Sequence, residues 1–197
     1  MPTNIPDFRA ADVVAVRATV DLIAKIAATD LALPTPCAGW DLATLLKHMT
    51  EQHDTFAAAV GGASAAVGSS APDPVRDYFA AAERVLDAFS PAEVLDREVV
   101  LAEAPHPIPG RMAISFHLVD YVVHGWDVAR SLGLTWELPD DVLRGALAIA
   151  EAVPDDAATR KSPGAPFAPR LPEPPTADPL SRILTLLGRS PTWSPPN

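Results

Sequence analysis

Apolar side chains recur every three or four positions along most of the chain, and the alternating pattern typical of strands is nearly absent. This spacing is that of amphipathic helices, so the sequence predicts an all-α protein. Long helices are expected from Phe8 or Asp12 to Ala28 and over residues 41–61, 73–90, 111–132 and 139–153, with a short helix over 178–188. Residues that favour helix ends support these limits. They are Asp41, Asp73 and Asp178 at helix starts, and Gly61, Gly133 and Gly188 after helix ends.

The segments between these helices are rich in residues that break regular structure. A connection rich in glycine, alanine and serine is expected over residues 61–71, and a loop over 103–110. The proline-dense residues 155–179 are expected to wrap the helices in extended form. Four long helices with short connections predict a four-helix bundle with additional short helices. We assign residues 1–154 to this bundle and its fifth helix, and residues 155–197 to a proline-rich tail with a short terminal helix packed on the same domain.

Composition narrows the classes of function. The 197 residues carry a net charge of −10, which argues against nucleic acid as a partner because phosphate binding needs clustered cations. No apolar run approaches the ~18–20 residues of a membrane span, and no export signal is recognisable, so we expect a cytoplasmic protein acting on a small molecule. A single cysteine excludes an internal disulfide. Alanine-rich helix faces favour a homodimer.

The predicted helix over 111–132 is the richest in candidate chemistry. It is apolar on two sides, and the gap between them holds His117, Asp120, His124 and Asp127. Buried titratable groups need partners, and a metal ion supplies one. Asp120 and His124 lie four residues apart, so their side chains share one helix face. A third ligand must come from another helix, and spacing alone does not decide between His48 and His53.

Two motifs resemble those of a known group of proteins. They are Pro34-Thr-Pro-Cys-Ala-Gly-Trp-Asp41 running into Leu45-Leu-Lys-His48, and Asp120-Tyr-Val-Val-His-Gly-Trp-Asp-Val-Ala-Arg130. The group is the DinB-like superfamily, in the actinobacterial branch named for the metal-binding domain of mycothiol-dependent maleylpyruvate isomerase. The closing Leu187-Gly-Arg-Ser-Pro191 also resembles the tail of a small uncharacterised family in that branch. The resemblance implies a DinB-like four-helix bundle that holds one divalent metal, zinc or nickel, through His48, Asp120 and His124, with Asp120 in place of the isomerase's glutamate.

Three protein ligands leave coordination positions open, which is the pattern of catalytic metal sites. The resemblance therefore implies a thiol-dependent transferase or isomerase that acts on a small electrophilic metabolite, with mycothiol as co-substrate. The isomerase also has a separate C-terminal domain, and nothing of that size follows Val153, so its own reaction is not expected here. The alternatives are a hydrolase that uses metal-bound water and a non-catalytic metal-binding helical protein.

Several other side chains are candidates for the surroundings of the metal. His117, His53, Trp40 and Trp126 are candidate pocket residues. Cys37 is expected to belong to a structural turn of the family. Asp127 is expected to cap the helix or to pair near Arg130. Four arginines could bind an anionic substrate, and the sequence does not rank them: Arg76, Arg84, Arg111 and Arg130.

Overall fold

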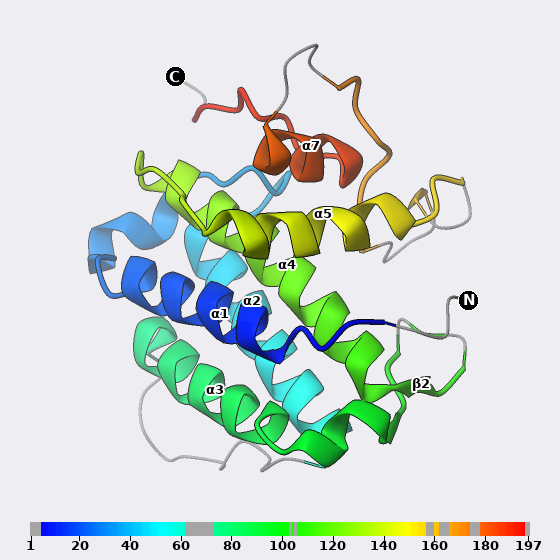
Figure 1. Cartoon of the computed structure of the whole chain (residues 1–197). Helices are drawn as coiled ribbons and strands as arrows, with labels where there is room; N and C mark the ends of the chain where they lie inside the picture. Colours follow the sequence, from blue (N-terminus) through cyan, green and yellow to red (C-terminus); the bar gives the residue numbers. More distant parts are fainter. Residues whose placement is uncertain are drawn as a thin grey trace.

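Four long helices form a bundle in the computed structural model, as the sequence predicts (Figure 1). They are α1 (Arg9–Ile23), α2 (Leu42–Ala59), α3 (Pro74–Phe89) and α4 (Gly110–Ser131). Helix α1 packs against α4 and α3, and α2 packs against α3 and α4, so the consecutive helices α1 and α2 lie diagonally across the bundle. The structure describes residues 5–61, 73–102, 104, 106–156, 160–161, 166–173 and 178–195.

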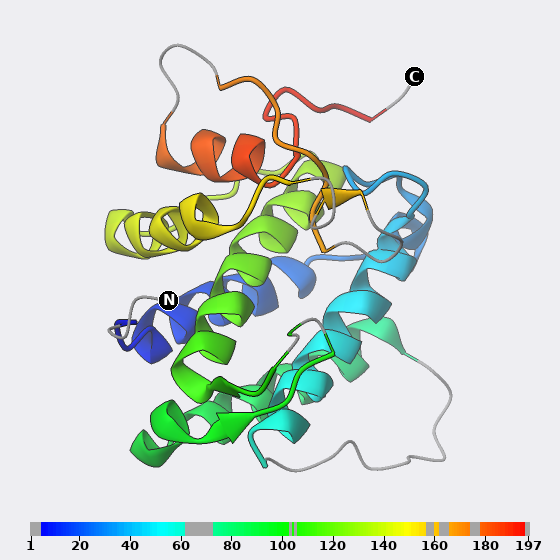
Figure 2. The same cartoon turned by 90° about the vertical axis from the view of Figure 1, so that its right-hand side faces the viewer.

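Two further helices cover one end of the bundle. Helix α5 (Asp140–Ala152) packs on α4 and α1, and α7 (Pro179–Leu186) packs on α5 from the outside (Figures 1 and 2). The described part of the proline-rich segment is tied to this layer, because the Leu171 amide donates to the carbonyl of Thr185 at 2.9 Å. The rest of that segment, and nearly all of the predicted connection over 61–71, lie outside the described residues.

Two short segments differ from the prediction. The loop expected over 103–110 includes strand β2 (Ile108–Pro109), which pairs antiparallel with β1 (Glu98–Val99). The first helix ends at Ile23 rather than at Ala28, and a 3₁₀ helix, η1 (Ala28–Ala32), follows. The carboxylate of Asp30 accepts a hydrogen bond from the Ala27 amide at 2.8 Å. The Asp30 side chain therefore caps the 3₁₀ helix. In a continued α-helix the Ala27 amide would instead donate to the carbonyl four residues before it. A second 3₁₀ helix, η2 (Ala92–Asp96), precedes β1.

The predicted helix ends are confirmed by their hydrogen bonds. The side chains of Asp41, Asp73 and Asp178 each accept from backbone amides in the first turn of α2, α3 and α7. Gly61, Gly133 and Gly188 have φ angles of 80°, 67° and 78°, the left-handed conformation that lets the chain leave a helix.

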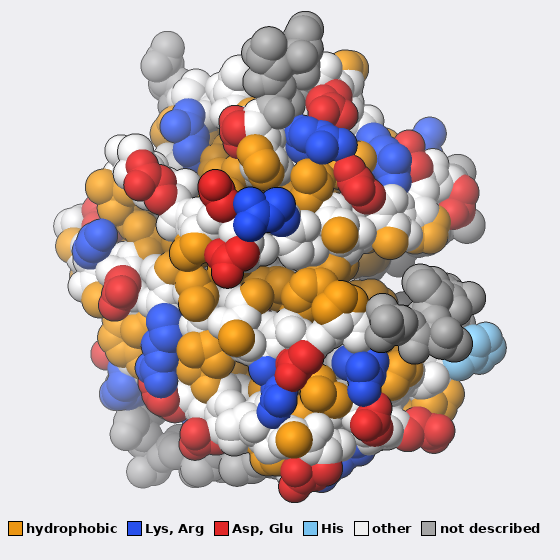
Figure 3. Space-filling view, in the orientation of Figure 1, with side chains coloured by type: hydrophobic (Ala, Val, Ile, Leu, Met, Phe, Trp, Pro, Cys, Tyr) orange, Lys and Arg blue, Asp and Glu red, His pale blue; other side chains and the backbone are white. Residues whose placement is uncertain are grey.

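Helix α4 is the centre of the molecule. It stands between the other bundle helices on one side and the α5 and α7 layer on the other (Figure 2). Most of its residues are buried, but the apolar side chain of Phe116 is 37% exposed. In the part of the chain that the structure describes, no helix is both long enough and apolar enough to cross a membrane. The face shown in Figure 3 carries acidic and basic side chains interspersed.

Candidate metal centre

The structure brings together the three side chains that the resemblance selects. His48 lies on α2, and Asp120 and His124 lie one turn apart on α4; one ligand atom from each lies within 4.8 Å of the others. The His124 Nε2 atom is 3.5 Å from Asp120 Oδ1, and the rings of His48 and His124 meet edge to face with centroids 5.2 Å apart. Ligand atoms around a tetrahedral zinc ion are ~3.3 Å apart, so this spacing fits such an ion after small side-chain movements.

The other side of the His124 ring is held by a buried acid. His124 Nδ1 lies 2.9 Å from Oδ2 of Asp127, which is completely buried. Since an ionised carboxylate only accepts hydrogen bonds, Nδ1 carries the proton and donates it. This bond fixes the ring and leaves Nε2 facing Asp120 and His48. A histidine held in this way by a carboxylate is a recurrent support of metal ligands.

Charge and burial set the protonation of the two histidines in the metal-free protein. Burial opposes a charge on His124, but Asp120 and Asp127 together outweigh it and raise the pKa of His124 to about 10. Burial and the nearby charge of His124 lower the pKa of His48, which keeps His48 neutral at pH 7. A metal ion that binds here therefore finds a free nitrogen on His48 and must replace one proton on His124.

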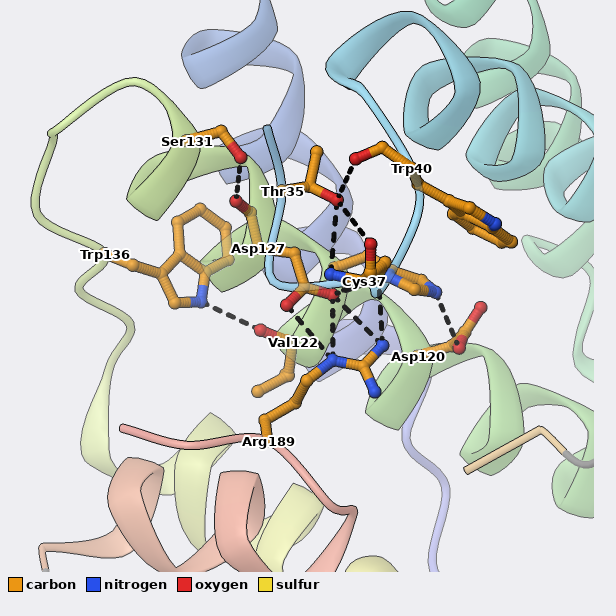
Figure 4. A network of polar contacts seen from close by, with 10 residues as sticks. Thr35, Cys37, Trp40, Asp120, Val122, Asp127, Ser131, Trp136 and Arg189 are labelled. Carbon is orange, nitrogen blue, oxygen red and sulfur yellow. Dashed lines mark hydrogen bonds and ion pairs between the residues drawn. The ribbon is translucent and has the colours of Figure 1, made fainter. Parts of the chain in front are cut away.

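A second group of possible ligands shares His124, and it contains Cys37 and Asp127. A guanidinium already occupies its neighbourhood. Arg189 Nε lies 3.2 Å from Asp127 Oδ1, and Arg189 Nη2 lies 3.2 Å from the Cys37 sulfur (Figure 4). A cation placed between Cys37 and Asp127 would lie beside this arginine and would be repelled at close range. We therefore assign Cys37, Asp127 and Arg189 to the support of the site and not to metal coordination.

The turn before α2 places Cys37 and Trp40 beside the candidate metal centre. Thr35 ties this turn together, because its hydroxyl contacts the backbone of Cys37 at 3.2 Å and the carbonyl of Trp40 at 3.0 Å. The Cys37 thiol lies 3.3 Å from Asp127. The half-buried indole of Trp40 lies 5.0 Å from the His48 ring, which makes it the predicted pocket residue that borders the ligand cluster.

The other three predicted pocket residues are buried, and their contact with a substrate stays a prediction. Trp126 is 5% exposed, and His53 and His117 are completely buried. The two histidines form a chain in which His53 Nδ1 lies 3.0 Å from His117 Nε2, and His117 Nδ1 lies 2.7 Å from the carboxylate of Asp12. Among the described residues, His53 Nε2 and Asp12 Oδ2 have no hydrogen-bond partner. These contacts give each ring nitrogen of His117 a hydrogen-bond partner, as a buried imidazole requires.

The arginines that the sequence offered as anion binders are engaged elsewhere. Arg84 pairs with Asp54, Arg76 with Asp77 and Arg111 with Asp96. The sequence had suggested that Asp127 caps the helix or pairs near Arg130. Instead, Arg130 donates to the backbone carbonyl of Trp193, and Asp127 pairs with Arg189. Sequence reasoning had not singled out Arg189, although its tail motif was one of the resemblances noted.

Comparisons with known proteins identify the family of the chain. Residues 13–129, which include all three candidate ligands, match the family described as the mycothiol maleylpyruvate isomerase N-terminal domain. Two uncharacterized proteins of Mycobacterium tuberculosis, from the CDC 1551 and H37Rv strains, are 27% identical to the chain over 178 residues, which cover 86% of this chain and 90% of theirs. No solved structure matches the chain. Because the family match spans more than half of its residues, the chain belongs to the mycothiol maleylpyruvate isomerase N-terminal domain family.

Proposed function

We propose that this protein binds one divalent metal ion, zinc or nickel, through His48, Asp120 and His124, and that it catalyses a thiol-dependent transfer or isomerisation of a small electrophilic metabolite. The convergence of two nitrogens and one carboxylate from two helices within 4.8 Å carries the proposal. This donor set matches zinc and nickel, which accept imidazole and carboxylate ligands.

The exposure of the ligands supports a catalytic role for the ion. Asp120 retains 20% of its side-chain exposure and His48 is half-buried, so the cluster is open on one side. A bound ion with an open position would supply Lewis acidity and would favour the thiolate form of a thiol. The chain's own residues fix the site: Asp127 orients His124, and Trp40 borders His48 with an apolar surface. The thiol is proposed from the family, whose name refers to mycothiol.

Elemental analysis of the untagged protein tests the metal part of the proposal. We expect about one equivalent of zinc or nickel per chain, and a loss of most of it in His48→Ala. His106→Ala is the control: it alters an exposed histidine outside the proposed ligand set, and the metal content should not change. A metal content near zero after dialysis against either ion would refute the ligand assignment.

Paired assays with and without a low-molecular-weight thiol test the reaction class. A thiol-dependent enzyme consumes an activated electrophile only when mycothiol is present, and both activity and metal are lost in His48→Ala. Activity without thiol would instead favour the hydrolase with metal-bound water. A protein that binds metal and is stabilised by it, but that transforms no electrophile or ester, would be a structural metal protein.

A further inference from the structure

The C-terminal segment reaches the candidate metal centre through one mostly buried side chain. The side chain of Arg189 is 13% exposed, and its guanidinium contacts both oxygens of Asp127, at 3.2 Å and 3.3 Å. Asp127 in turn holds His124 Nδ1 at 2.9 Å. A continuous chain of contacts therefore runs from the segment after α7, through α4, to a proposed metal ligand (Figure 4).

The backbone around Arg189 is built to hold it in place. At the end of α7, the Arg189 amide donates to the carbonyl of Leu184 at 2.8 Å, and the Gly188 amide donates to that of Thr185 at 3.2 Å. These two bonds are the Schellman ending of a helix, which requires the positive φ of Gly188. A side chain at Gly188 would also meet Ala168 at 2.6 Å, so the turn is closely packed. Both features direct Arg189 back toward α4.

A second contact joins the same segment to α4, this time with the arginine on α4. Arg130 of α4 donates to the carbonyl of Trp193 at 2.6 Å, while Arg189 of the segment reaches Asp127 of α4. The segment and α4 are thus linked by two arginines, one from each side.

The charge of Arg189 has a specific consequence for Asp127. This carboxylate is completely buried, and a buried charge without a partner is strongly unfavourable. The guanidinium compensates the charge, and two of its nitrogens fix the plane of the carboxylate. Without it, the Asp127 oxygens would turn toward other donors or water and would no longer hold His124 with Nε2 facing Asp120.

We propose that Arg189 is a positioning residue of the metal site, which acts through Asp127 on His124, and that metal binding and docking of residues 187–193 stabilise each other. The inference rests on the proposed metal site. By thermodynamic linkage, a docked segment that strengthens metal binding is itself stabilised by the metal by the same factor.

Zinc affinity, measured by competition with a chromophoric chelator, tests the positioning role. We expect Arg189→Met to bind Zn²⁺ about 10–100-fold more weakly, the usual effect of losing such support, and Arg189→Lys to be intermediate. Arg182→Met is the matched control, because Arg182 lies on α7 and pairs with Glu151 and Glu173 away from the centre. In an Asp127→Asn background, Arg189→Met should change the affinity by less than about threefold. Independent, multiplying effects of the two changes would overturn the role through Asp127.

Amide hydrogen exchange of the unaltered protein tests the coupling without any variant. Saturating Zn²⁺ should slow exchange in residues 187–193 by about fivefold or more. Unchanged exchange there, in a protein that binds zinc, would refute the coupling and leave the proposed metal site intact. A protein that binds no zinc at all would refute the metal site first. A folded Arg189→Met protein with the affinity of the unaltered chain would refute only the role of Arg189.

Discussion

Replacement of Gly125 by alanine should destabilise the protein, although alanine is the better helix former. Gly125 lies within α4, beside His124, and the ring of Trp136 packs directly over it. A Cβ atom at this position would meet the Trp136 ring at 2.2 Å, 2.5 Å and 2.8 Å. Carbon atoms pack at about 3.5–4.0 Å, so the ring would have to retreat by about 1.3–1.8 Å. The ring is 9% exposed and has little space in which to move.

The size of the effect follows from three contributions. Alanine gains about 1 kcal/mol over glycine from helix propensity, overpacking costs about 1–3 kcal/mol, and a lost hydrogen bond from a buried indole costs about 1–3 kcal/mol. The bond at risk joins Trp136 Nε1 to the carbonyl of Val122 at 3.0 Å. Together these contributions predict that Gly125→Ala lowers the free energy of unfolding by about 3 kcal/mol relative to the unaltered chain.

Urea unfolding followed by circular dichroism measures this change. Gly145→Ala in α5 is the control, since its Cβ would meet only the edge of the Phe8 ring, at 3.0 Å, and we expect a change of less than about 1 kcal/mol. Trp136→Leu should rescue part of the loss, so that the double variant is more stable than additivity predicts by about 1 kcal/mol or more. A Gly125→Ala protein as stable as the unaltered chain would refute the packing argument.

Three further predictions concern protons, helix ends and the metal. Burial and the neighbouring His117 hold the pKa of His53 well below its usual value, so only the unfolded state binds this proton. Urea unfolding of the metal-free protein should therefore show stability falling by about 1.4 kcal/mol per pH unit below pH ~6.5, and His53→Gln should reduce that slope. Asp178→Ala removes the cap of α7 and should cost about 1 kcal/mol while speeding hydrogen exchange after that helix. Zn²⁺ at 100 times its dissociation constant should add about 2.7 kcal/mol in thermal unfolding, and none in His48→Ala.

The helices were predictable because their signals are local. Asp73 followed by Pro74 marks the start of α3, and Gly188 marks the end of α7, and each acts on backbone groups within a few residues. The first helix was predicted too long because Ile26 and Ala27 continue the apolar spacing, while the Asp30 cap that competes with it is a single side-chain contact.

The candidate site was only partly predictable. Asp120 and His124 could be paired from their spacing, but the choice between His48 and His53 needed the resemblance, because both lie near the inner face of α2. The structure distinguishes them: His53 is bonded to His117 in the core, and His48 meets His124. Arg189 is separated from Asp127 by 62 positions, and no periodic pattern reports a contact over that distance.

The burial of α4 also bears on how proteins of this architecture can diversify. Two of the proposed ligands belong to a helix enclosed by core side chains on most of its surface, so substitutions there disturb folding and chemistry together. The turn that bears Trp40 and the segment that follows α7 approach the same centre from the outside. Substitutions in these outer parts should therefore change what the centre binds with less cost to folding than substitutions in the central helix.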